Sequence, residues 1–597
     1  MGFLYKKFRE QIKLWIWDYI GIVNRILRIA SVFVSMLTLC VIVYFYGYPQ
    51  TEESFLLCNI VIHGSLLFYV LKYFLQSFFN VHSLGYIRKH WFQGIITFSI
   101  IAWFILFYVF DFGKGQPLFA MNGGNAFNNI VMLSVQLYFF VLMLIELSRI
   151  GEVVDWIKIG PGGLLIASFL FLILMGTFLL LMPEMSVVDI RFLDALFTAA
   201  SASCVTGLSV VDIGTVFSFK GQFVIMMLVQ LGGINIICFA SFMAYFYSGT
   251  KLRYQSVVKE MLNTTLQGSR SLTREIILYT FVIEVIGFIL MFVYFSASRT
   301  YSTAVADNVF FSAFHTISAF NNAGFCLLKE GMMSPMLQHN YYIQTVIMFL
   351  TFLGGIGFLT IHNVFTTPVW KKGWWTHLQI TTKVVLKLSV MVILVGAAAF
   401  FILEYNNTSA NSSLADRIYK ALFSAVTSRT AGFNTVDFSF LKMPTSLIFI
   451  VLMVIGTAPG STGGGIKLTT FYILFKSAIA TVLDKKQVTI SNKAIPYGIV
   501  DRAYLVLLFS LSLIFIGTLC LSISDPQFSL AQILFEVSSA FGTVGSSVGV
   551  VPLLSDFGKC VIIFVMYIGR ITVLTLALSL TRRVFNRYSL ATTNIGI

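Results

Sequence analysis

Four short segments of the chain resemble one another, and each ends in a glycine where a helix would stop. They read LFTAASASCVTGLS (196–209), AFHTISAFNNAGF (313–325), LFSAVTSRTAGF (422–433) and LFEVSSAFGTVGSS (534–547). The opening Phe and the closing Gly stand ten residues apart in three segments and nine apart in the third. Glycine permits a turn with positive φ and leaves no side chain in the way of a ligand. Four such loops can present backbone carbonyl oxygens to a dehydrated monovalent cation.

The residues just before each glycine are small or polar, as a carbonyl-lined filter requires. We predict that the ion-binding filter consists of Val205, Thr206 and Gly207; Asn322, Ala323 and Gly324; Thr430, Ala431 and Gly432; and Thr543, Val544 and Gly545. These positions carry neither a ring of Asp or Glu nor a ring of Lys or Arg, which argues against divalent-selective and anion pores; Arg429 is basic in one segment only. Close helix packing explains one such loop equally well, but four in the same setting favour a pore.

The composition places the chain in a membrane. Of its 597 residues, 57% are hydrophobic and 11% are charged, whereas soluble domains carry roughly 25% charged residues. The net charge of +15 comes from basic residues in short loops between apolar segments, so it indicates membrane orientation and not nucleic-acid binding. The seven cysteines form no metal-binding or disulfide pattern, and no nucleotide-binding motif occurs. We therefore expect no cofactor in this chain and no enzymatic activity.

The elements that must hold the glycine loops are apolar segments of about 20 residues, the length that crosses a bilayer. Twelve spans are predicted: 26–47, 55–79, 92–112, 127–147, 163–183, 221–246, 275–296, 342–364, 382–403, 445–475, 502–523 and 559–580. Each glycine segment lies between two of the last eight spans and is predicted to be re-entrant. The predicted fold class is an all-α membrane protein with four span–pore-helix–span repeats around one central pore, preceded by an extra four-helix transmembrane bundle.

The domain boundaries follow from these spans. An N-terminal bundle of unknown role covers 1–159, and the four pore repeats cover 160–250, 251–366, 367–484 and 485–597, the last with a short cytosolic tail. Lys and Arg gather at the N-terminus, in the loops near 85, 260, 371 and 490, and in the tail, while alternate loops lack them. The positive-inside rule then puts both termini in the cytosol and makes all four glycine loops enter from outside.

The chain resembles the Trk/Ktr/HKT superfamily of potassium-uptake membrane subunits, most of all its bacterial Ktr and Trk members, over about 160–583. The resemblance is carried by CVTGL (204–208), NNAGF (321–325), SRTAGF (428–433), SAFGTVGSS (539–547), QLGGIN (230–235), LGGIGF (353–358), IGTAPGSTGGGIK (455–467) and MYIGR (566–570). It implies a potassium pore of four non-identical repeats, with potassium as the substrate. It also implies a homodimer in the plasma membrane, each protomer with its own pore, and a cytosolic nucleotide-binding regulatory ring as partner.

The stretch 456–467 interrupts the predicted span 445–475 with five glycines and a proline, which cannot stay helical. In the family the matching segment is an intramembrane gating loop below the filter. The resemblance therefore implies gating roles for Gly456, Gly460, Ser461, Thr462, Gly463, Gly464, Gly465 and Lys467, and for Arg570 as an electrostatic barrier in the pore. Arg570 lies near the middle of the last span, where an unpaired charge is costly and needs water or a partner.

The chain departs from the family pattern in several places. Asn235 stands where a third glycine is usual, the gating stretch reads GTAPGSTGGG and not GGSPGSTAGG, and Thr572 replaces a usual glycine. These departures leave the ion class intact but leave the details of gating open. The spans within 1–150 lie outside the match, and without a ladder of arginines we expect a scaffold or interaction bundle there and not a voltage sensor.

Two acidic residues complete the sequence interpretation. Glu284 lies in a predicted span. It could form an ion or proton site, or it could pack against a polar neighbour, and we prefer the packing role. Glu536 is expected to begin the fourth pore helix, where a carboxylate suits the helix dipole.

We predict potassium uptake across the membrane, driven by the membrane potential and gated by the intramembrane loop and a cytosolic partner. Sodium- or proton-coupled potassium symport, and a potassium/sodium transporter of the same fold, remain alternatives. A symporter built on inverted repeats and a sensor built on a dead pore are disfavoured, since the repeats run in one direction and all four glycines are present.

Overall fold

The computed structural model describes residues 26–79 without 28 and 32, the single positions 94, 97 and 98, and residues 161–247, 269–298, 301–367, 373–410, 412–485, 487–491 and 493–571. The chain divides into two compact units, 1–158 and 159–597, and each is described by itself. The predicted span 127–147, most of the predicted span 92–112, the N-terminal basic stretch and Thr572 with the tail lie outside the described residues.

The first unit contains two apolar helices that are long enough to cross a membrane, Ile29–Gly47 and α2 (Glu52–Phe79). Their contact is built from the buried side chains of Ile62, Leu66 and Tyr69, packed against Val34 and Val41. A hydrogen bond of 2.7 Å between the Thr38 and Ser65 hydroxyls joins the two helices at the same place. Small hydroxyl side chains at such a contact let two helices approach closely inside a bilayer.

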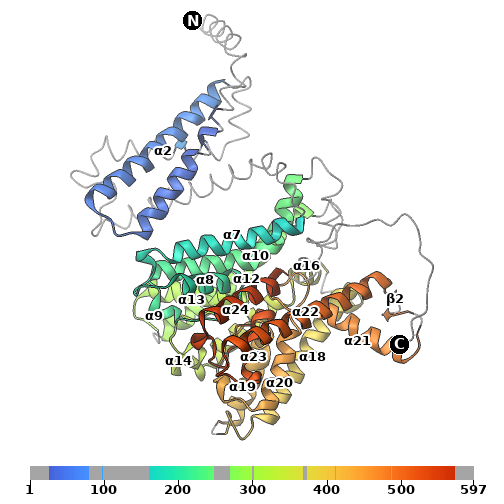
Figure 1. Ribbon diagram of the computed structural model, residues 1–597. Helices are drawn as coiled ribbons and strands as arrows, with labels where there is room; N and C mark the ends of the chain where they lie inside the picture. Colours follow the sequence, from blue (N-terminus) through green and yellow to red (C-terminus); the bar gives the residue numbers. More distant parts are fainter. Residues whose placement is uncertain are drawn as a thin grey trace, which may run out of the picture. The chain divides into compact units, whose positions relative to one another are not determined.

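In the second unit, one order of three helices occurs four times (Figure 1). It consists of a first helix, a shorter helix that leads into the filter glycine, which we call the pore helix, and a second helix. We call the first and second helices the first and second span of each repeat, whatever their length. The triplets are α7 (Pro161–Leu180), α8 (Phe192–Ser203) and α10 (Phe219–Tyr247); α12 (Ser269–Ser298), α13 (Val305–Phe320) and α15 (Tyr341–Gly355); α18 (Ile380–Leu403), α19 (Leu414–Thr427) and α20 (Met443–Val454); and α22 (Tyr497–Ser524), α23 (Leu530–Gly542) and α24 (Asp556–Ile571). We refer to these as repeats 1 to 4.

Short elements connect the helices of the triplets. They are α9 (Ile213–Val216), α14 (Pro335–Gln338), α16 (Phe358–Thr366), α17 (Trp374–His377) and α21 (Leu468–Val482), with 3-10 turns at Pro183–Met185, Gly331–Met333, Phe438–Phe440 and Val551–Leu553. Strands β1 (Thr489–Ile490) and β2 (Lys493–Ala494) form an antiparallel pair.

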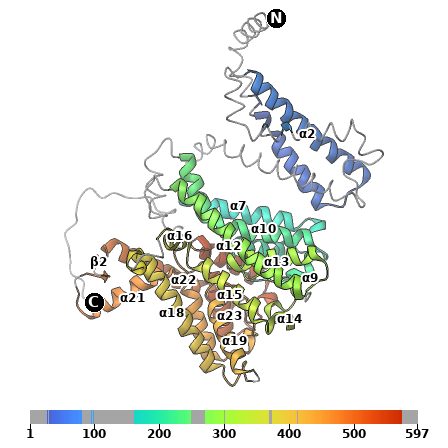
Figure 2. The same ribbon diagram turned by 180° about the vertical axis from the view of Figure 1, so that it is seen from behind.

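The four triplets pack in a closed cycle. The second span of each repeat lies against the pore helix of the next: α10 against α13, α15 against α19, α20 against α23, and α24 against α8 (Figures 1 and 2). The step from repeat 4 back to repeat 1 is also joined by an ion pair of 2.7 Å between the nearly buried Lys559 and Asp194. The pore helices therefore stand inside a ring of spans.

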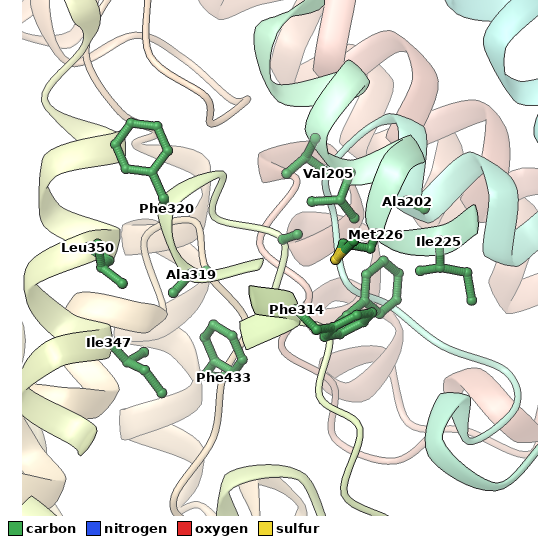
Figure 3. Packing of buried hydrophobic residues seen from close by; sticks show 14 of the residues in the cluster. Ala202, Val205, Ile225, Met226, Phe314, Ala319, Phe320, Ile347, Leu350 and Phe433 are labelled. Carbon is green, nitrogen blue, oxygen red and sulfur yellow. The ribbon is translucent and has the colours of Figure 1, made fainter. Parts of the chain in front are cut away.

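Large apolar side chains fill the space behind the pore helices. In Figure 3, Val205 and Met226 of repeat 1, Phe314 of α13, Leu350 of α15 and Phe433 of repeat 3 belong to one buried cluster. Because three repeats contribute to this cluster, burial of apolar surface holds the pore helices together, at roughly 25 cal/mol per Å². The opening Phe of each glycine segment is buried in such a core: Phe197, Phe314, Phe423 and Phe535.

Among the described residues, five helices are long and apolar enough to cross a membrane, or six if α15 and α16 form one bent span. The predicted span over 342–364 is therefore divided between two helices and is not one continuous helix. The helix breaks after Gly355 and resumes at Phe358 with a bend of 94°. Gly357 has φ 84° and lies against the Pro459 carbonyl oxygen, and the Phe358 amide donates to the Gly460 carbonyl oxygen (3.1 Å). The LGGIGF motif therefore ends one helix and starts another.

An acidic residue ends the first span of two repeats and binds the start of the second span. Glu404 follows α18 and accepts hydrogen bonds from the Lys442 amide (2.9 Å) and the Thr445 hydroxyl (2.6 Å). Asp525 follows α22 and accepts from the Ser555 amide (2.8 Å) and hydroxyl (2.8 Å). Burial alone would raise the pKa of the Asp525 carboxyl, but the hydrogen bonds outweigh burial and lower that pKa below its ordinary value.

This arrangement predicts how stability depends on pH. Since the folded-state pKa of Asp525 is lowered, its contribution is complete above the pKa of the unfolded chain, about 4, and is lost as the pH falls through the folded-state pKa. We expect Asp525→Asn to lower the thermal midpoint of the purified protein by about 2–4 °C at pH 7, and to flatten its fall below pH 4. Asp501→Asn, an exposed position on the same helix, is the control. Equal midpoints for wild type and Asp525→Asn would contradict the assignment.

Candidate functional site

The four predicted filter glycines lie in one closed ring. A Cβ atom added to Gly207 would come within 2.1 Å of the Ala323 oxygen, one on Gly324 within 2.2 Å of the Ala431 oxygen, one on Gly432 within 2.5 Å of the Val544 oxygen, and one on Gly545 within 2.1 Å of the Thr206 oxygen. Each glycine therefore touches the carbonyl that precedes the glycine of the next repeat, and the fourth touches the first. All four have φ between 70° and 90°, which L side chains rarely adopt.

The pore helices end in the same way in three repeats. Val205, Asn322 and Thr543, two positions before the glycine, have left-handed φ of 56°, 60° and 48°. The amide of the next residue then reaches back to a carbonyl five residues earlier, from Thr206 to Ser201 (2.8 Å), from Ala323 to Ser318 (2.7 Å) and from Val544 to Ser539 (2.9 Å). This is the Schellman arrangement of helix ends.

Repeat 3 reaches the same geometry with one residue fewer. The Ala431 amide bonds the Thr427 carbonyl oxygen four residues back (2.9 Å), and the described backbone has no left-handed residue between α19 and Gly432. The shorter spacing seen in the sequence is thus absorbed at the helix end and leaves Gly432 in the ring.

The filter loops keep their carbonyl oxygens unpaired. Within the described residues, no hydrogen bond to the oxygens of Thr206, Ala323, Ala431 or Val544 is present. The predicted filter residues are buried, apart from the partly exposed Gly207, Gly324 and Gly545. Unpaired backbone carbonyls inside a bilayer are tolerated only where they line water or bind ions. The ring can therefore hold a cation.

The stretch between α20 and α21 is an ordered, non-helical loop, which we call the intramembrane loop (Ile455–Lys467). Its two ends lie side by side, because Gly456 donates to the Ile466 oxygen (3.0 Å) and Ile466 donates to the Val454 oxygen (3.1 Å). A Cβ on Gly456 would come within 2.1 Å of the Gly464 oxygen, so the loop closes only with glycine there.

The tip of the intramembrane loop lies against the filter. Three successive loop residues each contact the residue two positions before a filter glycine. The Thr462 hydroxyl is hydrogen-bonded to the side-chain amide of Asn322 (3.0 Å), and the Gly464 amide donates to the Thr543 hydroxyl (2.8 Å). Between them, a Cβ on Gly463 would come within 2.5 Å of the Thr430 methyl carbon. A larger residue at either loop glycine would collide with the filter.

Arg570 connects this loop to repeat 1. Its guanidinium donates to the Thr462 carbonyl oxygen and to the Gly232 carbonyl oxygen (2.6 Å for the second), its Nε has no partner among the described residues, and the side chain is 1% exposed. Lys467 donates to the Gly463 carbonyl oxygen (2.7 Å) from the start of α21. The residues predicted from the resemblance for filter and gating thus lie in one contiguous cluster.

Two other features differ from the sequence interpretation or were missed by it. Glu536 does not begin the fourth pore helix: α23 starts at Leu530, and the buried Glu536 carboxylate accepts from the Ser547 hydroxyl (2.7 Å) and the Val548 amide (2.9 Å) just after the filter. The hydrogen bonds that join the loop to the side chains of Asn322 and Thr543 were also not foreseen, since no local pattern signals them. Glu284 has polar neighbours, as preferred above: Gln230 and Asn321.

Comparison with known proteins gives concordant similarities. Residues 164–585 match the TrkH family model, described as cation transport protein. Ktr system potassium uptake protein B of Bacillus subtilis is 38% identical over 436 residues, which cover 72% of this chain and 95% of the relative. Potassium/sodium uptake protein NtpJ of Enterococcus hirae is 34% identical over 431 residues, covering 71% and 93%.

A solved structure has the same fold. The crystal structure of the potassium transporter TrkH from Vibrio parahaemolyticus aligns with a TM-score of 0.55 and 19% identity, covering 75% of this chain and 91% of that chain.

Proposed function

Because this chain belongs to the TrkH family of cation transport proteins, we propose that it takes up potassium through the ring formed by Gly207, Gly324, Gly432 and Gly545. The observation that carries the proposal is the closed contact of each glycine with the preceding carbonyl of the next repeat. The relatives named as potassium uptake proteins support the choice of ion.

The chemistry of the ring favours a monovalent cation. Carbonyl dipoles from four repeats can replace a hydration shell, and the filter positions supply no carboxylate for a divalent ion and no cation for an anion. The membrane potential drives uptake, at about 2.3 kcal/mol for each charge moved through 100 mV. The ion passes through one central pore within each chain.

The intramembrane loop and Arg570 form the gate. The loop tip lies against the filter residues of repeats 2, 3 and 4, and Arg570 joins it to repeat 1. In this arrangement the conduit is closed just below the filter. Opening requires the loop to leave these contacts, and a positive charge beside the path opposes cation entry until it does.

The assembly is a homodimer in the bacterial plasma membrane, with both termini in the cytosol and a cytosolic nucleotide-binding ring as regulator. The relative named as a Ktr system B protein supports a multi-component system.

Potassium-limited growth tests the proposal. An uptake-deficient bacterial strain that expresses this chain, with and without a cytosolic ring partner, is expected to grow at potassium concentrations that do not support the parent strain. Rubidium influx measured with and without added sodium separates potassium uptake from sodium-coupled transport or combined potassium/sodium transport. The last of these is included because the E. hirae relative is named a potassium/sodium uptake protein. Normal membrane abundance without potassium influx in either setting would refute the proposal.

A further inference from the structure

A polar cluster lies behind the filter of repeat 2, and the gate does not use it. It consists of Glu284 in the middle of α12, Gln230 of α10 and Asn321 at the end of α13. Gln230 donates to one carboxyl oxygen of Glu284 (3.0 Å), and Asn321 donates to the other (3.2 Å) and to the Gln230 side-chain oxygen (2.8 Å). Asn321 is fully buried. A carboxyl group inside a membrane protein is costly and is retained where it has a role.

The hydrogen bonds require a group at position 284 whose two oxygens both accept. Both partners approach the carboxyl with amide N–H groups, and glutamine in that place would turn one N–H toward another N–H. The Asn321 side-chain nitrogen shares its two N–H groups among three acceptors, since the Ile317 carbonyl oxygen lies 3.0 Å away as well. Gly233 lies against the oxygen of the Asn321 side-chain amide, because a Cβ atom added to Gly233 would come within 1.9 Å of that oxygen. Asn321 is therefore held in one orientation.

Asn321 is the last residue before the filter of repeat 2. It caps α13, and the next residue, Asn322, has the left-handed φ of 60° that starts the filter loop. A shift of Asn321 moves Asn322 and, with it, the Ala323 oxygen that touches Gly207. The carboxyl of Glu284 is thus one hydrogen bond from Asn321, which lies two residues before Ala323.

The other repeats have no such cluster at the same position. Three residues before the filter glycine stand Cys204, Asn321, Arg429 and Gly542 in repeats 1 to 4. Of these, the side chain of the buried Arg429 makes a single hydrogen bond in the described residues, 3.5 Å to the Ser389 carbonyl oxygen. Among the described residues, only in repeat 2 is the side chain at this position hydrogen-bonded to a carboxyl group on the first span of the same repeat.

We infer that Glu284 is a positioning residue for ion selectivity: by accepting hydrogen bonds from Gln230 and Asn321, its carboxylate fixes the Asn321–Asn322 turn and thereby the geometry of the repeat 2 carbonyls in the filter. The inference rests on the proposed filter. It assigns Glu284 no contact with the ion.

The test compares potassium and sodium influx into the uptake-deficient strain for variants present at equal membrane abundance. Glu284→Gln is expected to lower the preference for potassium over sodium roughly tenfold, the effect of losing one hydrogen bond to a charged group. Repeat 1 has a cysteine, Cys204, at the position equivalent to Asn321. Asn321→Cys is expected to lower the preference for potassium to a similar extent. Glu284→Asp is expected to retain more of it than Glu284→Gln.

Controls separate the possible outcomes. Glu404→Gln changes another buried carboxyl, which follows the end of α18 and lies outside the filter residues, and it is expected to leave the selectivity ratio unchanged. If Glu284→Gln does not reach the membrane, Asn321→Cys carries the test. Wild-type selectivity in both variants would overturn the inference while leaving the filter intact, whereas a wild-type chain without potassium influx would overturn the proposed function instead.

Discussion

Gly324→Ser is expected to remove most of the preference for potassium over sodium. The new Cβ would overlap the Ala431 carbonyl at 2.2 Å, and backbone at a left-handed φ of 72° cannot relieve the contact without moving the filter. Left-handed backbone alone costs an L-residue about 1–2 kcal/mol, so we expect the selectivity ratio to fall by about 10- to 100-fold. Competition between rubidium and sodium influx in whole cells measures the ratio.

The matched control is Gly498→Ser, at a glycine of α22 around which an added Cβ meets nothing within 4 Å. It is expected to behave as wild type. If Gly324→Ser reached the membrane and selected potassium as wild type does, the four loops would not be the filter.

Arg570→Ala is expected to raise potassium flux measured without the cytosolic partner by about tenfold or more. The substitution removes the donors to the Thr462 and Gly232 carbonyls, and hydrogen bonds from a charged donor contribute about 1.5–3 kcal/mol. It also removes a positive charge from the ion path. Rubidium influx at equal membrane abundance gives the readout.

Arg570→Lys separates the two effects, because lysine keeps the charge but cannot bond both carbonyls in the same fork; we expect an intermediate flux. Arg417→Ala is the control, since Arg417 also donates to backbone carbonyls, those of Ser412 and Ala410, but lies outside the gate. Flux of Arg570→Ala equal to wild type would deny the arginine any part in closing the pore.

The sequence predicted the family and the all-helical membrane fold, and both are confirmed by the family match and the shared fold. The family is one of transporters, so the prediction that the chain is not an enzyme is confirmed as well. These successes have a physical cause: span length and the fourfold glycine pattern are local signals. The domain boundaries and the individual filter and gating roles stay predictions.

Where the sequence interpretation was wrong or silent, the cause lies in distant contacts. The break at Gly357 depends on the Gly460 carbonyl about a hundred residues later, and the contact of Thr462 with Asn322 joins segments 140 residues apart. Both features follow from packing between repeats, which a pattern within one repeat does not contain. Glu536 is the exception, because it was misplaced for a local reason: the capping box of Ser529 and Gln532 starts α23 earlier than expected.

The pairing of Lys559 with Asp194 has a consequence for how the protein is made. These residues are 365 positions apart, and they belong to the last helix of repeat 4 and the pore helix of repeat 1. We therefore expect the cycle of repeats to close only after α24 has been synthesised. A chain that terminates before Asp556 is expected to lack the contact that joins repeat 4 to repeat 1, and to be degraded faster than the full-length protein.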